Sequence, residues 1–142
     1  NTLANFTDSE SHRDYFVHMK RLFNSIASKI AVEYNASAIL TGENLGQVSS
    51  QTLGNLGAVE EASNLRILRP LLGLDKQTII DQARDLGTYD IAAGPEVCDA
   101  LGPDHPTTVA DLGRLRKNEL KHGGIDYLSE QCISTLRIRQ LG

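Results

Sequence analysis

Two segments of the chain carry side chains whose types and spacing suit binding or catalysis. The first, Thr41-Gly-Glu-Asn-Leu-Gly-Gln-Val-Ser-Ser-Gln-Thr52, combines a glycine turn with hydroxyl and amide side chains. Gly42 would let a ligand approach the backbone, and Gln47 or Gln51 would hydrogen-bond a base or a ribose. An ordinary turn between a strand and a helix has the same composition. The sequence contains neither Gly-Lys-Ser/Thr nor Gly-x-Gly-x-x-Gly, which excludes the two common phosphate-binding motifs.

The second segment surrounds Cys98, within an irregular stretch from Ala92 to Pro106 that holds three of the four prolines. A thiol in an accessible loop can act as a nucleophile through its thiolate, whereas a buried thiol is inert. A lone cysteine is more commonly a small core residue, and the apolar surroundings of Cys132 fit that second interpretation. Cys98 is therefore the candidate reactive thiol.

The other ionisable groups give weaker patterns. His12 and His18 are six residues apart, so they lie on different faces of a helix and do not form a metal-binding pair. We predict no metal site. A basic cluster would face an RNA or, as an alternative that is at least as good, form a solvated helix face. The cluster consists of Arg114, Arg116, Lys117 and Lys121.

The element that presents the first segment is a short apolar strand, Ser37 to Thr41, of the kind that is buried on both faces in a parallel sheet. Gly42 then stands at its carboxyl end, where ligands bind in open α/β sheets. A long amphipathic helix precedes the strand and ends near Tyr34-Asn35. Thr7 and Glu10 have the spacing of a capping box for its start, and Leu3 to Phe6 resembles the end of a strand.

Helical and strand patterns alternate along the rest of the chain, which indicates an α/β fold with a parallel sheet. The expected elements are a helix over Val48–Ala62, a strand over Leu65–Leu72 stopped by Pro70, a helix from Asp75 to Gly87, a helix from Thr107 or Thr108 to Lys121, a short helix over Ile125–Cys132 and a strand over Thr135–Leu141.

Length and composition narrow the class of protein. The chain has 142 residues, 40% of them hydrophobic, and a formal net charge of −4, as expected for one globular domain. A stand-alone nucleic-acid binder would be more basic. The two cysteines do not make a disulfide framework and fit a reducing cytoplasm, and no apolar run is long enough to span a membrane.

The segment from Thr41 to Leu56 closely resembles the signature of the tRNA 4-thiouridine sulfurtransferase family, also called the thiamine-biosynthesis ThiI family. The likeness continues through Ile67-Leu-Arg-Pro-Leu71, Leu86-Gly-Thr88 and the Pro95-Glu-Val-Cys98 loop. The resemblance implies a PP-loop ATPase domain, Rossmann-like, with a mostly parallel sheet and helices on both faces. It implies an enzyme that adenylates a tRNA uridine with ATP and Mg²⁺ and then replaces the uridine oxygen by sulfur, with a further role in thiamine thiazole synthesis.

The resemblance also assigns individual residues. Lys20, Gly42 and Gln51 match ATP-binding positions of the family, and Cys98 matches the cysteine of its catalytic loop. The implied partners are tRNA, a sulfur donor such as a cysteine desulfurase or sulfide, and a second copy in a homodimer. Leu101 stands where some relatives carry a second cysteine of a Cys-x-x-Cys pair, so we expect no iron–sulfur cluster.

One departure from the family pattern is large. The Ser-Gly-Gly-x-Asp-Ser phosphate loop of the family is absent, so we expect residues 1–142 to be the C-terminal portion of a single PP-loop ATPase domain. By itself this portion should bind ATP weakly. Two alternatives stay open at this point: a degenerate, non-catalytic module that serves binding or assembly, and another PP-loop ATPase that acts on a small molecule.

Overall fold

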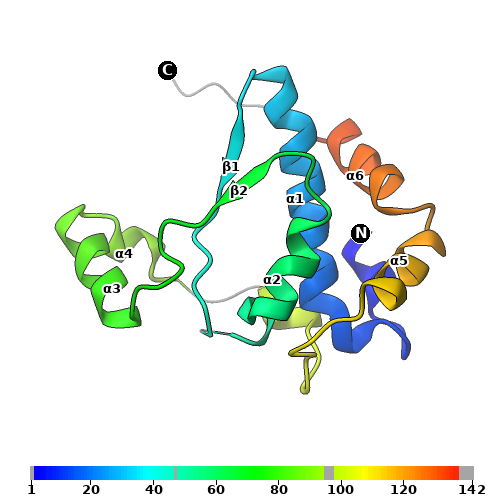
Figure 1. The fold of residues 1–142 in the computed structure, drawn as a ribbon, viewed down its shortest axis with the longest axis horizontal. Coiled ribbons are helices and arrows are strands. Elements are labelled where there is room, and N and C mark those ends of the chain that lie inside the picture. The colour runs from blue at the N-terminus through cyan, green and yellow to red at the C-terminus, as the bar shows by residue number, and fades with distance from the viewer. Residues whose placement is uncertain (1, 47, 95–97, 138–142) are drawn as a thin grey trace.

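The computed structural model describes residues 2–46, 48–94 and 98–137 and shows helices arranged around a pair of parallel strands (Figure 1). β1 pairs with β2 so that Ile39 lies opposite Ile67, which confirms the parallel α/β arrangement. The elements in chain order are the 3₁₀ helices η1 (Thr2–Phe6) and η2 (His12–Asp14), α1 (Tyr15–Glu33), β1 (Ala38–Leu40), η3 (Ser49–Gln51), α2 (Leu53–Glu60), β2 (Arg66–Leu68), α3 (Lys76–Asp85), α4 (Tyr89–Ala92), η4 (Cys98–Leu101), α5 (Leu112–Leu120) and α6 (Ile125–Ser134).

Helix α1 is the centre of the molecule because it is apolar on two sides. Val17 packs against α2 and α5, in a cluster with Val59 and Leu115, and each of these three side chains is at most 1% exposed. Leu22 belongs to a second cluster, in which Leu128 of α6 is buried. The helix ends as the sequence predicts, since Asn35 takes the left-handed conformation (φ 52°) that closes a helix.

The sequence-based interpretation of the N-terminus was wrong. Residues Thr2–Phe6 form η1 instead of a strand, and the Thr7 hydroxyl donates backwards to the carbonyl of Ala4. Asp8 accepts the N–H groups of Glu10 and Ser11, and the Glu10 side chain pairs with a lysine far along the sequence. Thr7 and Glu10 therefore form no capping box, and α1 begins only at Tyr15.

Two other expectations needed smaller corrections. Strand β1 is not buried on both faces in this chain, because the side chain of Leu40 is 72% exposed. The helix expected over Val48–Ala62 is split into η3 and α2. Thr52 adopts extended backbone angles between them, and its hydroxyl accepts the N–H of Asn55 as the cap of α2.

The C-terminal half follows its local signals. Asp75 caps α3 through the N–H of Thr78, and Gly87 ends that region with a φ of 68°. Helix α5 begins later than predicted, after its cap Asp111. Gly123 and Gly124, both with positive φ, lead into α6 as expected. The strand predicted over Thr135–Leu141 lies mostly outside the described residues.

Candidate functional site

The loops that follow β1 and β2 are bound to each other, which fixes the backbone at the carboxyl end of the parallel pair. The N–H of Thr41 donates to the carbonyl of Leu68 (3.0 Å), and the N–H of Leu45 donates to that of Leu72 (3.0 Å). Between them, the side-chain amide of Asn44, which is 4% exposed, donates to the carbonyls of Leu71 and Leu74. The turn that carries Gly42 is therefore a rigid platform rather than a free loop.

Gln51 stabilises this platform from the other side. Its side-chain oxygen accepts the N–H of Asn44 (2.6 Å), and its backbone carbonyl accepts the N–H of Gly46 (3.0 Å). The oxygen of Gln51 is thus used inside the protein, and the amide NH₂ is the end that it can offer to a ligand. Gln47, the other glutamine that the sequence singles out, lies outside the described residues.

Lys20 reaches the same place from α1. Its ammonium donates to one carboxylate oxygen of Glu43 (2.9 Å), and Arg69 donates to the other oxygen from its Nε (2.8 Å). Arg69 is bound at its far end by Glu60 (2.7 Å). Burial raises the pKa of Glu43, but the hydrogen bonds from the two cations outweigh burial and hold that pKa below its usual range. Glu43 is therefore a carboxylate at neutral pH.

Gly42 lies at the edge of this cluster with open space beside it. A methyl group added at Gly42 would meet no atom within 4 Å. Neither a positive φ nor close packing within the described chain requires a glycine here. Next to it, Lys20, Phe23, Asn24, Thr41 and Glu43 line a hollow of about 190 Å³. Lys20 and Gln51 thus bind Glu43 and Asn44, the two residues that follow Gly42 at the end of β1, and the ATP-binding role of Lys20, Gly42 and Gln51 stays a prediction.

Cys98 is the first residue of η4, and the position of its side chain lies outside what the structure describes. The segment that follows is attached to the start of α1. The ring of His12 donates to the carbonyl of Leu101 (3.0 Å), and Gly102 lies so close to the ring of Phe16 that a side chain there would collide with it. Phe16 precedes Lys20 by four residues and shares its face of α1. Leu101 and Gly102, which follow Cys98, therefore lie against η2 and the start of the helix that carries Lys20.

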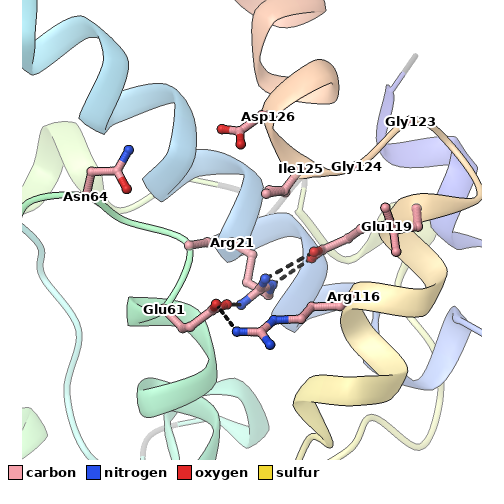
Figure 2. Close-up of a pocket in the computed structure, with 11 residues that line it drawn as sticks. Arg21, Glu61, Asn64, Arg116, Glu119, Gly123, Gly124, Ile125 and Asp126 are labelled. Atoms are coloured by element: carbon pink, nitrogen blue, oxygen red, sulfur yellow. Dashed lines mark hydrogen bonds and ion pairs between the residues drawn. The ribbon is translucent and has the colours of Figure 1, made fainter.

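A larger hollow, of about 430 Å³, lies between α1, α2, α5 and α6 and is lined by paired charges (Figure 2). Arg21 donates to both carboxylate oxygens of Glu119 (2.6 and 3.0 Å) and to Glu61 (2.8 Å), and Arg116 also pairs with Glu61. His18 donates to Glu119 as well (3.3 Å). Burial raises the pKa of Glu119, but these donors lower it further than burial raises it. This cluster connects helices and is separate from the Gly42 turn.

The basic cluster on and after α5 is more than the solvated helix face that the sequence offered as an alternative to an RNA-facing patch, because most of its cations pair with carboxylates of other elements. Arg114 donates to both carboxylate oxygens of Asp14 (2.7 and 3.0 Å), and Lys121 pairs with Glu10. With the Arg116–Glu61 pair, three of the four cations join α5 to other parts of the fold.

Cys132 is partly buried against the α1–α6 core, and its thiol donates to the hydroxyl of Thr2, in agreement with a structural role.

Sequence reasoning missed Glu43 and Arg69, although both belong to the segments that it quoted. A signal was available, since a carboxylate directly after an apolar strand is rarely buried unless it is paired.

Among the described residues, no group of three or more histidine, cysteine, aspartate or glutamate side chains could hold a metal ion. Within the same residues, no helix combines the length and the apolar character that crossing a membrane would need.

Comparisons with known proteins find relatives along most of the chain. A profile of the family described as thiamine biosynthesis protein (ThiI) matches residues 2–122. A probable tRNA sulfurtransferase from Moorella thermoacetica is 40% identical over 126 residues, which are 87% of this chain and 32% of that protein. A tRNA sulfurtransferase from Shewanella frigidimarina is 46% identical over 106 residues, which are 74% of this chain and 22% of that protein.

Among solved structures, the crystal structure of a 4-thiouridine synthetase–RNA complex with bound ATP matches with a TM-score of 0.84 and 33% identity. The match covers 94% of this chain and 35% of that one. The chain thus spans a third or less of the length of the two curated relatives, and close to a third of the matching structure.

Proposed function

The chain belongs to the thiamine biosynthesis protein (ThiI) family, and we propose that it contributes the nucleotide-binding and sulfur-transferring part of an ATP-dependent tRNA sulfurtransferase. One observation carries the proposal: Lys20, Gly42 and Gln51 surround the carboxyl end of β1, in a fold that matches an ATP-bound 4-thiouridine synthetase. Parallel α/β sheets bind their ligands at this end of their strands.

The residues of the site would divide the work of nucleotide binding. The base or ribose of ATP would accept from the amide NH₂ of Gln51, and Gly42 would let the nucleotide approach the backbone. The ammonium of Lys20 would meet the phosphates, where a mobile point charge suits negative charge that shifts during adenylyl transfer. Mg²⁺ would arrive with the phosphates of ATP, because it usually binds through substrate phosphates and waters together with one or two carboxylates.

The chemistry has two steps. The uridine oxygen O4 attacks the α-phosphorus of ATP, pyrophosphate leaves and the uridine becomes adenylated. The Cys98 thiolate then attacks the inner sulfur of a persulfide on a donor such as a cysteine desulfurase. The new disulfide between Cys98 and the donor cysteine forms from the thiolate's electron pair, and hydrosulfide leaves with both electrons of the broken S–S bond; an external thiol then reduces the disulfide for the next turnover. The hydrosulfide attacks C4 of the uridine and AMP leaves, which gives 4-thiouridine.

The test is formation of 4-thiouridine in unmodified tRNA by the complete protein, with ATP and a persulfide or sulfide donor. We expect ATP-dependent thiolation, a lower rate for Lys20→Met and an unchanged melting temperature for that variant. A complete protein that binds neither ATP nor tRNA would instead support a non-catalytic binding or assembly module, and one that adenylates only a small molecule would support a different PP-loop ATPase.

Further parts of the proposal have their own measurements. Sulfur delivery to the thiazole of thiamine, which the family description suggests, is tested by complementation of a thiamine-requiring strain. A homodimer is tested by sedimentation of the complete protein. A cytoplasmic location, where unmodified tRNA is available, is tested by cell fractionation.

A further inference from the structure

The carboxylate of Glu43 occupies an unusual place for a site that binds an anion. It is 8% exposed, lies one residue from Gly42 and neutralises the one cation that α1 contributes to this site. A buried carboxylate beside a phosphate site should weaken binding by repulsion unless it serves another purpose. Its contacts suggest which purpose that is.

Each oxygen of Glu43 has its own cation. Oε1 accepts from Lys20, and Oε2 accepts from Arg69 and, at 3.3 Å, from the hydroxyl of Thr41. Arg69 is itself held by Glu60, so the carboxylate of Glu43 has a fixed position and orientation. The side chains of Glu43 and Arg69 are each 10% exposed, whereas that of Lys20 is 18% exposed. Lys20 is thus the more exposed of the two cations that bind Glu43, and at the other end of the chain of ion pairs Glu60 is 49% exposed.

We propose that Glu43 is the positioning residue of the nucleotide site: clamped by Arg69, it holds the ammonium of Lys20 at the end of β1, ready for the phosphates. The idea rests on the proposed function in one respect, namely that Lys20 contacts the nucleotide. A free lysine side chain loses rotamer entropy when it binds a ligand, and a carboxylate that has already restrained it removes part of that cost.

A second observation is that Arg69 keeps one donor for a further acceptor. The Nη2 group of Arg69 is buried and has no hydrogen-bond partner among the described residues. Buried donors of this kind are nearly always satisfied, by protein, by water or by a ligand. An anionic oxygen that enters beside Lys20 would meet a second donor after a small shift of Arg69.

The decisive experiment is a double-mutant cycle on ATP affinity in the complete protein, with Glu43→Gln and Lys20→Met. Glutamine keeps the shape but offers one oxygen to two cations, so Lys20 loses its anchor. We expect Glu43→Gln to weaken ATP binding about tenfold in the wild-type background and less than about twofold in the Lys20→Met background.

Two outcomes of the cycle would overturn the proposal. Tighter ATP binding by Glu43→Gln would mean that Glu43 merely repels the phosphates, and an equal loss in both backgrounds would mean that it does not act through Lys20. Glu130→Gln is the matched control, because Glu130 also accepts from a lysine of α1 (Lys29, 3.0 Å) but on the side of α6, and it should leave ATP affinity unchanged. If Glu43→Gln fails to fold, Glu43→Asp takes its place in the cycle, since it keeps the charge and withdraws it from Lys20.

A readout without nucleotide separates this inference from the proposed function. Lys20 can be acylated with a limiting amount of an amine-reactive reagent, and mass spectrometry measures the rate. This rate should rise several-fold in Glu43→Gln, while the acylation rate of Lys29 stays constant. If wild-type protein does not bind ATP, the proposed function fails, and the acylation rate still decides whether Glu43 positions Lys20. An unchanged rate at Lys20 would overturn the positioning role.

Discussion

Lys20 and Arg21 are neighbours in sequence, yet they belong to two ion-pair networks with opposite characters. Successive residues of an α-helix point about 100° apart, so one side chain reaches the end of β1 and the other reaches α2 and α5. The side chain of Arg21 is 1% exposed and forms hydrogen bonds to Glu119, Glu61 and a backbone carbonyl. That of Lys20 is 18% exposed, borders a hollow and has one carboxylate partner.

The difference teaches how to separate a structural charge network from a functional one. The Arg21 network is closed at its arginine, because Nε, Nη1 and Nη2 of the guanidinium all donate to acceptors of the fold and connect three helices (Figure 2). The buried Nε2 of His18, which belongs to the same network, has no partner among the described residues. The Lys20 network is open, since its outermost cation faces accessible space and its inner arginine keeps an unused donor. The larger hollow belongs to the Arg21 network, so cavity size and the proposed nucleotide site point to different places.

The largest expected effect is on sulfur transfer, through Cys98. In the complete protein, Cys98→Ser should abolish sulfur transfer to tRNA while ATP affinity is kept, because a hydroxyl at neutral pH neither attacks a persulfide nor carries sulfur. The free energy of unfolding should change by less than about 1 kcal/mol, as for a loop substitution. The measurements are 4-thiouridine formation, ATP titration and thermal unfolding.

Cys132→Ser is the matched control, because Cys132 packs against the α1–α6 core. It should lose more stability, about 1–2 kcal/mol, and keep its activity. Normal thiolation by Cys98→Ser, or unfolding of that variant, would show that Cys98 is a structural residue.

The second largest effect should separate the two neighbouring cations. Arg21→Met leaves Glu119 buried without its main partner and should cost about 3–5 kcal/mol of unfolding free energy. Lys20→Met should change stability by less than about 1 kcal/mol, since its partner Glu43 keeps Arg69, and should instead weaken ATP binding. Chemical denaturation of both variants beside ATP titration gives the comparison.

A double variant sharpens this test. Arg21→Met with Glu119→Leu removes the buried charge together with its partner, so it should recover much of the lost stability. If the double variant is no more stable than Arg21→Met alone, the unpaired Glu119 carboxylate is not the cause of the lost stability. The structural role given to the Arg21–Glu119 pair would then be wrong.

A smaller effect should appear at acid pH, where the two networks behave alike. The pKa values of Glu43 and Glu119 are both held below the ordinary 4.5 by cations and hydrogen bonds. Because the folded-state pKa is the lower one, each group stabilises the fold fully above about pH 4.5 and loses that contribution as the pH falls further. Unfolding free energy measured from pH 6 down to pH 3 should therefore decline.

Variants identify the groups responsible for this decline. Glu119→Gln and Glu43→Gln should each make the acid slope shallower, and the two reductions should add, since the residues belong to separate networks. An acid slope that is the same in Glu119→Gln as in the wild type would contradict the assignment of a lowered pKa to that carboxylate.

The smallest stability effect is expected at Gly42. Alanine there meets no atom of the described chain and requires no unusual φ, so stability should stay within about 0.5 kcal/mol of wild type. ATP affinity should nevertheless fall, because the methyl group occupies the approach to the backbone. Gly123→Ala is the contrasting control: its φ of 94° and the nearby ring of Tyr127 make the substitution destabilising. A fully active Gly42→Ala would remove Gly42 from the site.

Much of the fold could be predicted because its signals are local. The caps of α3 and the glycines with positive φ act through bonds between residues a few positions apart. The apolar periodicity of α1 and the strands that precede and follow α2 in the sequence could also be predicted. The N-terminal capping box was predicted from a local pattern too, but a long-range contact overrides it. Glu10 pairs with Lys121, which is 111 residues away, instead of with the nearby backbone.

The candidate site residues came from the sequence alone: the Thr41–Thr52 segment offered Gly42 with Gln47 or Gln51, and the family resemblance selected Lys20, Gly42, Gln51 and Cys98. Only the tertiary structure decided that Glu43 lies between Lys20 and Arg69, across separations of 23 and 26 residues, and that Arg21 faces away from them. The physical reason is that a charge becomes structural or functional through its burial and its partners. Both depend on which elements pack around α1, and no local pattern specifies that packing.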